Sequence, residues 1–353
     1  MAERIRLYAG TQEGLFVWKS NNGGWDEVYQ GFKEAVIDTM SGCKQYPERV
    51  YTGVAGDGVY RTEDGGAHWR RLLEGDIRAV AVDPTDDNVV YAGTEPIHLY
   101  RSEDRGDTWE EITGLQDLPE EVKMNWWFPR PPHLGHVRNI FVHPDDPNTI
   151  YLCLEHGGIA RSFDRGKTWE DVSAGIDYLD IHVLSNLPGS TTRYYVATAR
   201  GFFMSDDPAD GWSRAENGFT RDYFHDFIFL PAAREGDNPT MLIASADKSP
   251  GSWDRPEVAR GAIFRSTDCA QSWHRVGEGI PEEMKEMVWA LVHHPTDTNA
   301  VYAGFGQVAR GHTYDDADFG EGGLILLTRD RGDSWEKVNL DLPQDRVLWV
   351  AAD

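Results

Sequence analysis

The strongest constraint on the fold is an eight-residue pattern that recurs along the whole chain. It reads Ser/Thr-x-Asp-x-Gly-x-Thr/Ser-Trp, and its five clearest copies end at Trp69, Trp109, Trp169, Trp273 and Trp335. Two weaker copies, which end at Trp25 and Trp212, bring the total to seven. A motif that returns at intervals of this size is typical of a repeat architecture in which each copy marks one structural unit.

The segments around each motif predict four short strands per repeat. In the third repeat a β-rich run over 78–82 ends near Pro84, and two more runs cover 90–94 and 99–102 before a short strand that follows Trp109. Short runs of this composition, separated by turn residues, are typical of β-strands. Seven such repeats predict an all-β fold, a single seven-bladed β-propeller with four-stranded blades.

The two ends of the chain are predicted to share one blade. The first repeat begins with a second-strand run at 6–11, and an unmatched first-strand run lies at 346–350. The C-terminal strand is therefore expected to complete blade 1, which closes the ring and removes exposed sheet edges. The predicted blades cover 5–30 with 346–352, then 33–73, 76–113, 136–173, 180–215, 223–277 and 287–339.

The motif resembles the Asp-box of the BNR-repeat proteins. In such a turn the aspartate is expected to accept backbone N–H bonds, the glycine to take a positive φ and the tryptophan to pack beneath. The blades also look like those of sialidases and xyloglucanases. Sialidases generally have six blades, and no motif here matches their arginine triad. Xyloglucanase clefts lie between two tandem propellers, of which this chain supplies one, so the resemblance specifies fold rather than reaction.

Three repeats carry about twenty extra residues. Successive motif tryptophans lie 44, 40, 60, 43, 61 and 62 residues apart, and the extra residues fall at 114–135, 247–260 and 307–322. In an up-and-down blade, the connections between strands two and three leave on the same face as those between blades. All three insertions are therefore expected on one face, where long loops on a rigid scaffold are usually functional.

Polar residues are predicted at the starts of the inner strands, where apolar residues would be usual. Alignment of these strands on their terminal prolines groups Arg78, Arg138, His182, His225 and Trp289. The positions two residues earlier hold Asp76, His136, Asp180, Tyr223 and Met287. Pleating turns residues two apart to the same side, and unpaired charge in a core is costly. These residues therefore predict a polar axial pocket on the face that bears the insertions.

The favoured hypothesis is a glycosidase-like hydrolase or a lyase that acts on a small polar, anionic or sugar-like molecule. The predicted acids, bases or nucleophiles are His182, His225, Asp180, Glu155 and Tyr223. The predicted substrate-binding residues are Arg78, Arg138, Arg200, His136, His156, Trp126, Trp127, Trp289 and Arg310. The arginines would hold substrate charge, and the aromatic side chains of 125–129 would form a lid or a stacking wall.

Two alternatives remain open on the sequence. One is a non-catalytic scaffold that holds a protein partner through the loop face, as the BNR-type photosystem II assembly factor does. The other is a metal site at the axis, since imidazole is a common ligand of divalent metals. Its ligands would be His136, His156, His182 and His225. No other cofactor is assigned.

Composition excludes some partners. A formal net charge of −25 disfavours nucleic acid and anionic membranes, because phosphates would be repelled. The first residues lack the apolar core of a signal peptide, and no apolar run approaches a membrane span. Three widely spaced cysteines suggest no disulfide framework. These features predict a cytoplasmic protein.

Overall fold

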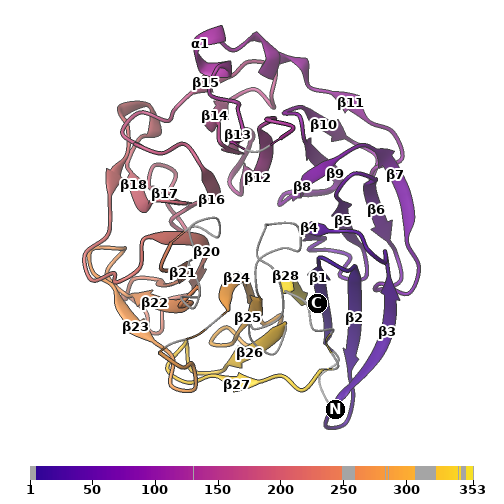
Figure 1. Ribbon diagram of the computed structural model, residues 1–353, viewed down its shortest axis with the longest axis vertical. Coiled ribbons are helices and arrows are strands. Elements are labelled where there is room, and N and C mark those ends of the chain that lie inside the picture. Colours follow the sequence, from indigo (N-terminus) through magenta and orange to yellow (C-terminus); the bar gives the residue numbers. More distant parts are fainter. Residues whose placement is uncertain are drawn as a thin grey trace. The chain divides into compact units, whose positions relative to one another are not determined.

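The computed structural model describes residues 5–129, 131–248, 259–282, 284, 286–306, 323–340, 342 and 347–352, with backbone alone at 38 and 347–352. Within these residues, 28 strands form seven four-stranded antiparallel sheets (Figure 1). The fold is a seven-bladed β-propeller, as the count of motif copies predicted. No helix of the described chain is long and apolar enough to cross a membrane.

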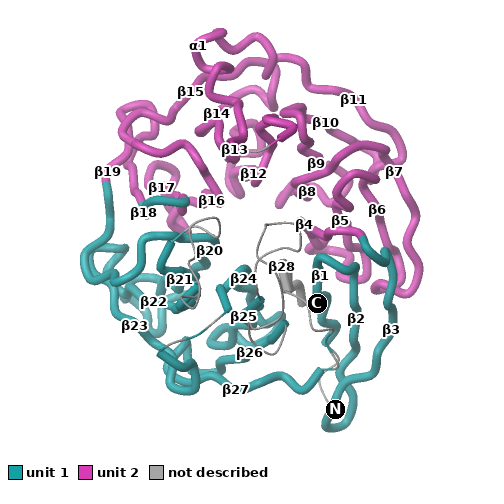
Figure 2. Tube along the Cα trace, in the orientation of Figure 1, with its two compact units in different colours: residues 1–34, 199–202, 214–353 teal, residues 35–198, 203–213 magenta. Residues whose placement is uncertain are grey.

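One compact unit comprises residues 35–198 and 203–213 (Figure 2). Its first two sheets are β4 (Ile37–Gly42), β5 (Val50–Val54), β6 (Gly58–Thr62), β7 (Arg70–Glu74) and β8 (Ile77–Asp83), β9 (Asp86–Thr94), β10 (Leu99–Ser102), β11 (Glu110–Glu111). The next two are β12 (His136–His143), β13 (Asp146–Glu155), β14 (Gly158–Ser162), β15 (Glu170–Asp171) and β16 (Ile181–Asn186), β17 (Tyr194–Thr198), β18 (Gly201–Ser205), β19 (Ser213–Arg214), the last two of which include residues assigned to the other unit. Three short helices are η1 (Thr113–Asp117), α1 (Glu120–Lys123) and η2 (Pro208–Asp210).

The other unit comprises residues 1–34, 199–202 and 214–353. Two of its sheets are β20 (Tyr223–Leu230), β21 (Thr240–Ala246), β22 (Ala262–Ser266), β23 (His274–Val276) and β24 (Met287–His293), β25 (Val301–Gly306), β26 (Leu324–Thr328), β27 (Glu336–Lys337). The third joins β28 (Val347–Ala352) to β1 (Arg6–Thr11), β2 (Leu15–Ser20) and β3 (Trp25–Gly31). β28 pairs antiparallel with β1, so the C-terminal strand completes the first blade as predicted.

The recurring motif forms the turn between the third and fourth strands of a blade. In the third blade, Ser102 Oγ accepts a hydrogen bond from the Gly106 backbone N–H at 2.7 Å. The Asp104 carboxylate accepts from the Thr108 N–H at 2.8 Å, and Trp109 Nε1 donates to the Gly106 carbonyl at 3.0 Å. The Thr108 N–H and hydroxyl lower the pKa of Asp104 to about 2. Gly106 has a φ of 88°, so the motif residues hold a tight turn as expected.

An arginine directly before the motif connects neighbouring blades, a contact that the repeat pattern did not reveal. Arg101 Nη1 donates to the backbone carbonyl of Arg165 at 3.3 Å, and Arg265 Nη1 donates to that of Arg331 at the same distance. Both acceptors lie inside the next motif and have positive φ, 61° and 64°. The turn of one blade therefore supplies a backbone carbonyl that accepts a hydrogen bond from an arginine of the preceding blade.

Replacing Ser102 with alanine is expected to lower the free energy of unfolding by about 1–3 kcal/mol, because the buried Gly106 N–H then has no acceptor. Urea unfolding followed by circular dichroism measures this. Lys167→Ala, at an exposed position of the next motif copy, is the control and should change stability by less than about 0.5 kcal/mol. Equal effects of both changes would contradict the role given to Ser102.

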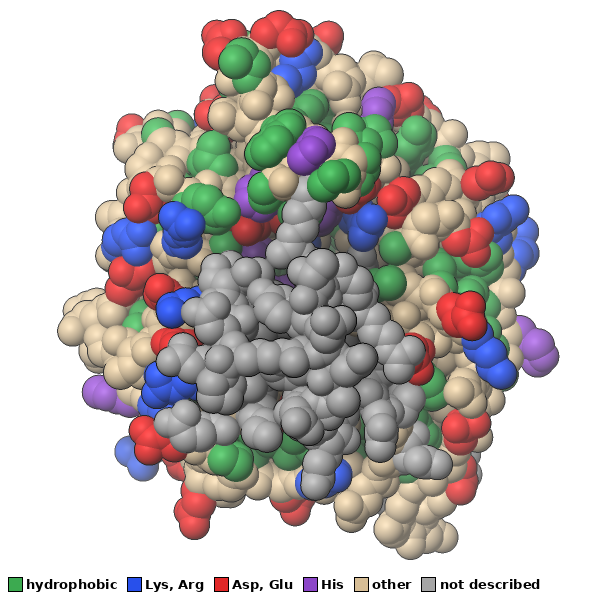
Figure 3. Space-filling view, in the orientation of Figure 1, with side chains coloured by type: hydrophobic (Ala, Val, Ile, Leu, Met, Phe, Trp, Pro, Cys, Tyr) green, Lys and Arg blue, Asp and Glu red, His purple; other side chains and the backbone are tan. Residues whose placement is uncertain are grey.

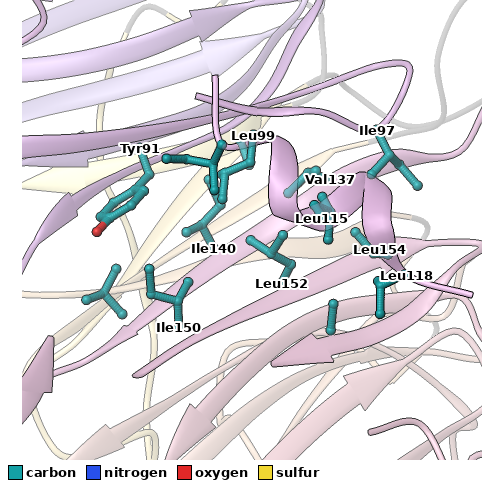
Figure 4. Packing of buried hydrophobic residues seen from close by; sticks show 14 of the residues in the cluster. Tyr91, Ile97, Leu99, Leu115, Leu118, Val137, Ile140, Ile150, Leu152 and Leu154 are labelled. Atoms are coloured by element: carbon teal, nitrogen blue, oxygen red, sulfur yellow. The ribbon is translucent and has the colours of Figure 1, made fainter. Parts of the chain in front are cut away.

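The first insertion is more ordered than the predicted irregular loop. It contains η1 and α1, and the side chains of Leu115 and Leu118 are buried in the core cluster of the third and fourth blades. Figure 4 shows these two leucines beside Ile97, Val137 and Leu154. These two buried leucines therefore anchor the segment that follows them in the chain. The insertion at 307–322 and most of 247–260 lie outside the described residues, so their common face stays a prediction.

Candidate functional site

The aligned polar position of the inner strands is a β-bulge. The register shifts between Ile77 and Ala79, between Val137 and Asn139, and between Ile181 and Val183. The same shift occurs in β20 and β24, and the extra residues are Arg78, Arg138, His182, His225 and Trp289. A bulge leaves one residue out of the ladder and re-aims its side chain. This local geometry lets polar residues occupy the start of an otherwise apolar strand.

His136 lies between two carboxylates in the unit formed by 35–198 and 203–213. Its Nε2 lies 3.0 Å from Glu155 Oε2, and its Nδ1 lies 3.2 Å from Glu95 Oε2. The histidine begins β12, Glu155 ends β13 and Glu95 follows β9, so two neighbouring blades supply the three groups. The His136 side chain is nine-tenths buried, which weakens solvent screening of these charges.

Two arginines extend this group of charges along the same strands. Arg78 Nε lies 3.0 Å from Asp76 Oδ1, and its Nη2 lies 3.3 Å from Glu95 Oε2. Arg138 Nε lies 3.6 Å from Glu155 Oε2. We call the six residues Asp76, Arg78, Glu95, His136, Arg138 and Glu155 the ion-pair row. Both arginines of the row therefore face carboxylates of the chain itself.

The protonation of the ion-pair row follows from these contacts. Burial alone would lower the pKa of His136, but the Glu155 and Glu95 carboxylates raise it to about 9. Burial would likewise raise the pKa of Glu155, but His136 and Arg138 hold it well below its usual value. His136 and Arg78 overcome burial and lower the pKa of Glu95. At neutral pH the row thus holds an imidazolium between two carboxylates.

Asp180, which directly precedes β16 of the next blade, lies close to two histidines. Its Oδ2 is 3.5 Å from His156 Nε2, and its Oδ1 is 3.4 Å from His182 Nε2. The side chain of Asp180 is only 10% exposed, and Oδ1 has no hydrogen-bond partner among the described residues. A buried carboxylate with such weak donors is costly.

Aromatic side chains of the first insertion cover both groups. The Phe128 ring lies 5.0 Å from the His156 ring, edge to face, and 6.1 Å from the His136 ring. Trp127 is half exposed and stacks on His133 with the ring centroids 4.9 Å apart. Trp126 packs on the core, and its buried Nε1 has no hydrogen-bond partner in the described chain. Figure 3 shows hydrophobic and histidine side chains gathered on this face near α1 and β12.

Comparisons with known proteins agree with the motif. A model of the BNR-Asp box repeat matches residues 99–112, the third-blade turn described above. The chain thus carries the BNR-Asp box repeat on a β-propeller fold. An oligoxyloglucan-reducing end-specific xyloglucanase of Emericella nidulans is 24% identical over 223 residues, which are 61% of this chain and 25% of that protein. The chain thus spans about a quarter of the length of this curated relative.

Two solved structures resemble this Asp-box propeller in fold. The GH74 enzyme of Niastella koreensis matches with a TM-score of 0.62 and 16% identity, over 94% of this chain and 46% of that one. A structure titled YCF48 bound to D1 peptide matches with a TM-score of 0.53 and 16% identity, over 86% of this chain and 82% of that one. The β-propeller fold is thereby confirmed, and the match to YCF48 covers most of both chains.

The remaining predicted residues of this Asp-box propeller belong to the unit of 1–34, 199–202 and 214–353. His225 Nδ1 contacts the Trp289 carbonyl at 2.7 Å, and its ring lies edge to face with that indole at 4.8 Å. The rings of Tyr223 and His225 stack at 6.3 Å. The Arg200 carbonyl accepts from Arg214 at 3.0 Å. The functional roles assigned to these residues stay predictions, and Arg310 lies outside the described residues.

Residues to which the sequence assigned no individual role complete the site. Glu95 pairs with His136 and Arg78; the sequence placed it at the same turn of its blade as Glu155 but assigned it no partner. Phe128 was grouped with its aromatic neighbours, and its contacts with the histidines depend on the path of the insertion. Tyr178 lies edge to face with His156 at 5.7 Å.

The metal alternative gains no support from this arrangement. The described residues contain no group of three or more His, Cys, Asp or Glu side chains placed to hold a metal ion. Both ring nitrogens of His136 face carboxylates of the ion-pair row. Nδ1 of His225 contacts a backbone carbonyl. A nitrogen engaged in this way would have to exchange its partner before it could bind a metal.

Proposed function

We propose that this Asp-box propeller is a glycoside hydrolase whose site comprises Asp180, Glu155 and the surrounding histidines beneath Phe128. The observation that carries the proposal is the contrast between the two carboxylates. Glu155 is firmly ionised by His136 and Arg138, whereas Asp180 has only two distant histidine contacts. Glycoside hydrolysis uses one carboxylate that stays charged and a second group that carries a proton.

The chemistry follows from these roles. The Glu155 carboxylate would stabilise positive charge as it develops at the anomeric carbon. His156 or His182, each in contact with the Asp180 carboxylate, would deliver a proton to the glycosidic oxygen as its bond to that carbon breaks. Water then adds its hydroxyl to the anomeric carbon and returns a proton to the site. Phe128 and Trp127 would contact the apolar faces of the sugar rings.

Isosteric removal of the charges tests the proposal. Asp180→Asn and Glu155→Gln are each expected to reduce kcat/KM about 100-fold or more, since general acid–base groups contribute about 10²–10⁴-fold. Release of reducing ends is measured on xyloglucan oligosaccharides, following the relative's name, and then on other β-linked glycans. Asp210→Asn in η2 is the control for the lost charge, and circular dichroism checks folding. No hydrolysis by the wild type, or equal rates in all variants, would disprove the hydrolase.

A non-catalytic protein-binding propeller is the second candidate. The chain matches 82% of the length of the YCF48 structure, and that structure is titled as bound to a peptide. Two large hydrophobic side chains of the first insertion, Met124 and Trp127, are 79% and 53% exposed. Exposed apolar groups close together favour a partner surface. The glycan assay separates the candidates, because a scaffold would hydrolyse none of the substrates.

A further inference from the structure

We propose that this site selects sugars without an anionic group, and that Asp180 recognises a hydroxyl or ammonium donor of the bound sugar. The inference rests on the proposed function in one respect, namely that a sugar occupies the site. It concerns charge and hydrogen bonding rather than bond cleavage. It also narrows the anionic or sugar-like ligand that the sequence predicted.

The first support is that both arginines of the ion-pair row are already paired. Arg78 lies within 3.3 Å of carboxylate oxygens of both Asp76 and Glu95. Arg138 shares Glu155 with the imidazolium of His136. A ligand carboxylate, sulfate or phosphate would have to displace one of these carboxylates, which would leave a partly buried charge without its partner. The cations of the row therefore stabilise the protein's own anions.

The second support is the hydrogen-bonding state of Asp180. Its two histidine contacts, at 3.4 and 3.5 Å, are long for charge-assisted hydrogen bonds, and Oδ1 has no partner within the described chain. Oδ1 is buried, and one-tenth of the side-chain surface stays accessible, so a single donor group would approach the carboxylate through that remaining surface. A hydroxyl or ammonium group would satisfy it, whereas a ligand carboxylate would place like charges together.

The third support is the balance of fixed charges. Within the ion-pair row the three cations Arg78, Arg138 and protonated His136 are matched by the three carboxylates Asp76, Glu95 and Glu155, so the row holds no excess of positive charge for an anionic ligand. The whole chain carries a formal net charge of −25, which adds a repulsive field for anions. The local ion pairs and the net charge of the chain thus both disfavour the binding of an anion.

A matched set of tetrasaccharides tests the selection. All three probes share a β-1,4-linked gluco backbone: cellotetraose, its 2-amino counterpart and its 6-carboxylate counterpart. Calorimetric titration in about 0.3 M NaCl screens the long-range field and leaves short-range contacts. The 6-carboxylate probe is expected to bind at least about tenfold more weakly than cellotetraose, and the 2-amino probe at least as tightly as cellotetraose. Titrations are run in the cold, and chromatography checks that the probes remain intact.

A variant pair ties the effect to Asp180. Asp180→Asn is expected to weaken binding of the 2-amino probe about tenfold, because a neutral acceptor replaces a charged one. Asp210→Asn removes the same charge from exposed η2 and should leave all affinities unchanged. Binding in the expected order without hydrolysis would support the selection and disprove the hydrolase. Equal affinity for the carboxylate probe, equal effects of the two variants, or no binding of any probe would overturn the selection.

Discussion

Removal of residues 345–353 is expected to cost the protein most of its stability. β28 pairs with β1 at five positions, from Leu7 opposite Ala352 to Thr11 opposite Val347. At about 1 kcal/mol for each lost backbone hydrogen bond, the truncation costs about 5 kcal/mol before any packing is lost. Domains are stable by only about 5–15 kcal/mol, so the truncated chain should unfold near room temperature or fail to fold.

Thermal unfolding of the full and truncated chains measures this effect, and complementation separates it from misfolding during expression. A synthetic peptide of residues 345–353, added in excess, should restore much of the lost Tm by pairing with the exposed edge of β1. A peptide of the same composition in scrambled order should not. A truncated chain whose Tm stays within about 2 °C of the full chain would show that closure by β28 contributes little.

Stability is expected to fall as the pH rises from about 6.5 to about 9. The pKa of His136 is raised from 6.5 to about 9 by the Glu155 and Glu95 carboxylates. A group whose folded pKa is raised stabilises the fold fully below its unfolded pKa, and this contribution is lost as the pH passes through the folded value. The loss amounts to about 3 kcal/mol. On the acid side, the lowered pKa values of Glu95 and Glu155 give stability above about pH 4.5 that is lost as the pH falls.

Urea unfolding at about pH 6 and about pH 9 measures the alkaline loss. His136→Gln should be less stable than the wild type at the lower pH, because two carboxylates lose their cation, and its stability should change little between the two pH values. His68, which is exposed and pairs with Asp64, provides the control, and His68→Gln should keep the wild-type pH dependence. A wild type whose stability is the same at both pH values would contradict the charged state given to His136.

The fold was predictable because each blade repeats a motif whose contacts are short-range in sequence. The Ser102, Asp104, Gly106 and Trp109 positions of the motif form hydrogen bonds within eight residues of one another, so sequence spacing alone specifies the turn. The unmatched strand at the C-terminus indicated closure for a similar reason, since one blade lacked a first strand. The contact from Arg101 to Arg165 was not predictable, because it joins residues 64 apart through the placement of whole blades.

The strand positions of the candidate site residues were predictable from the sequence, but their pairing was not. Alignment on the strand-terminal prolines brought Arg78, Arg138 and His182 to one position, and each proves to be a bulged residue. Their partners depend on how adjacent blades pack, so Glu95 was not assigned to His136. Because these partners were unknown, the sequence also led to the expectation that the arginines would be available to bind an anionic ligand.

By itself, the sequence determined the seven blades, the turn chemistry of the motif and the polar starts of the inner strands, because each depends on residues close together in the chain. Only the tertiary structure decided which charges meet. Glu95, His136 and Glu155 come from three separate segments, and their protonation depends on burial and on distances of 3.0 and 3.2 Å. Electrostatic interaction energies vary steeply with distance and burial, and neither quantity is encoded in the spacing of a repeat.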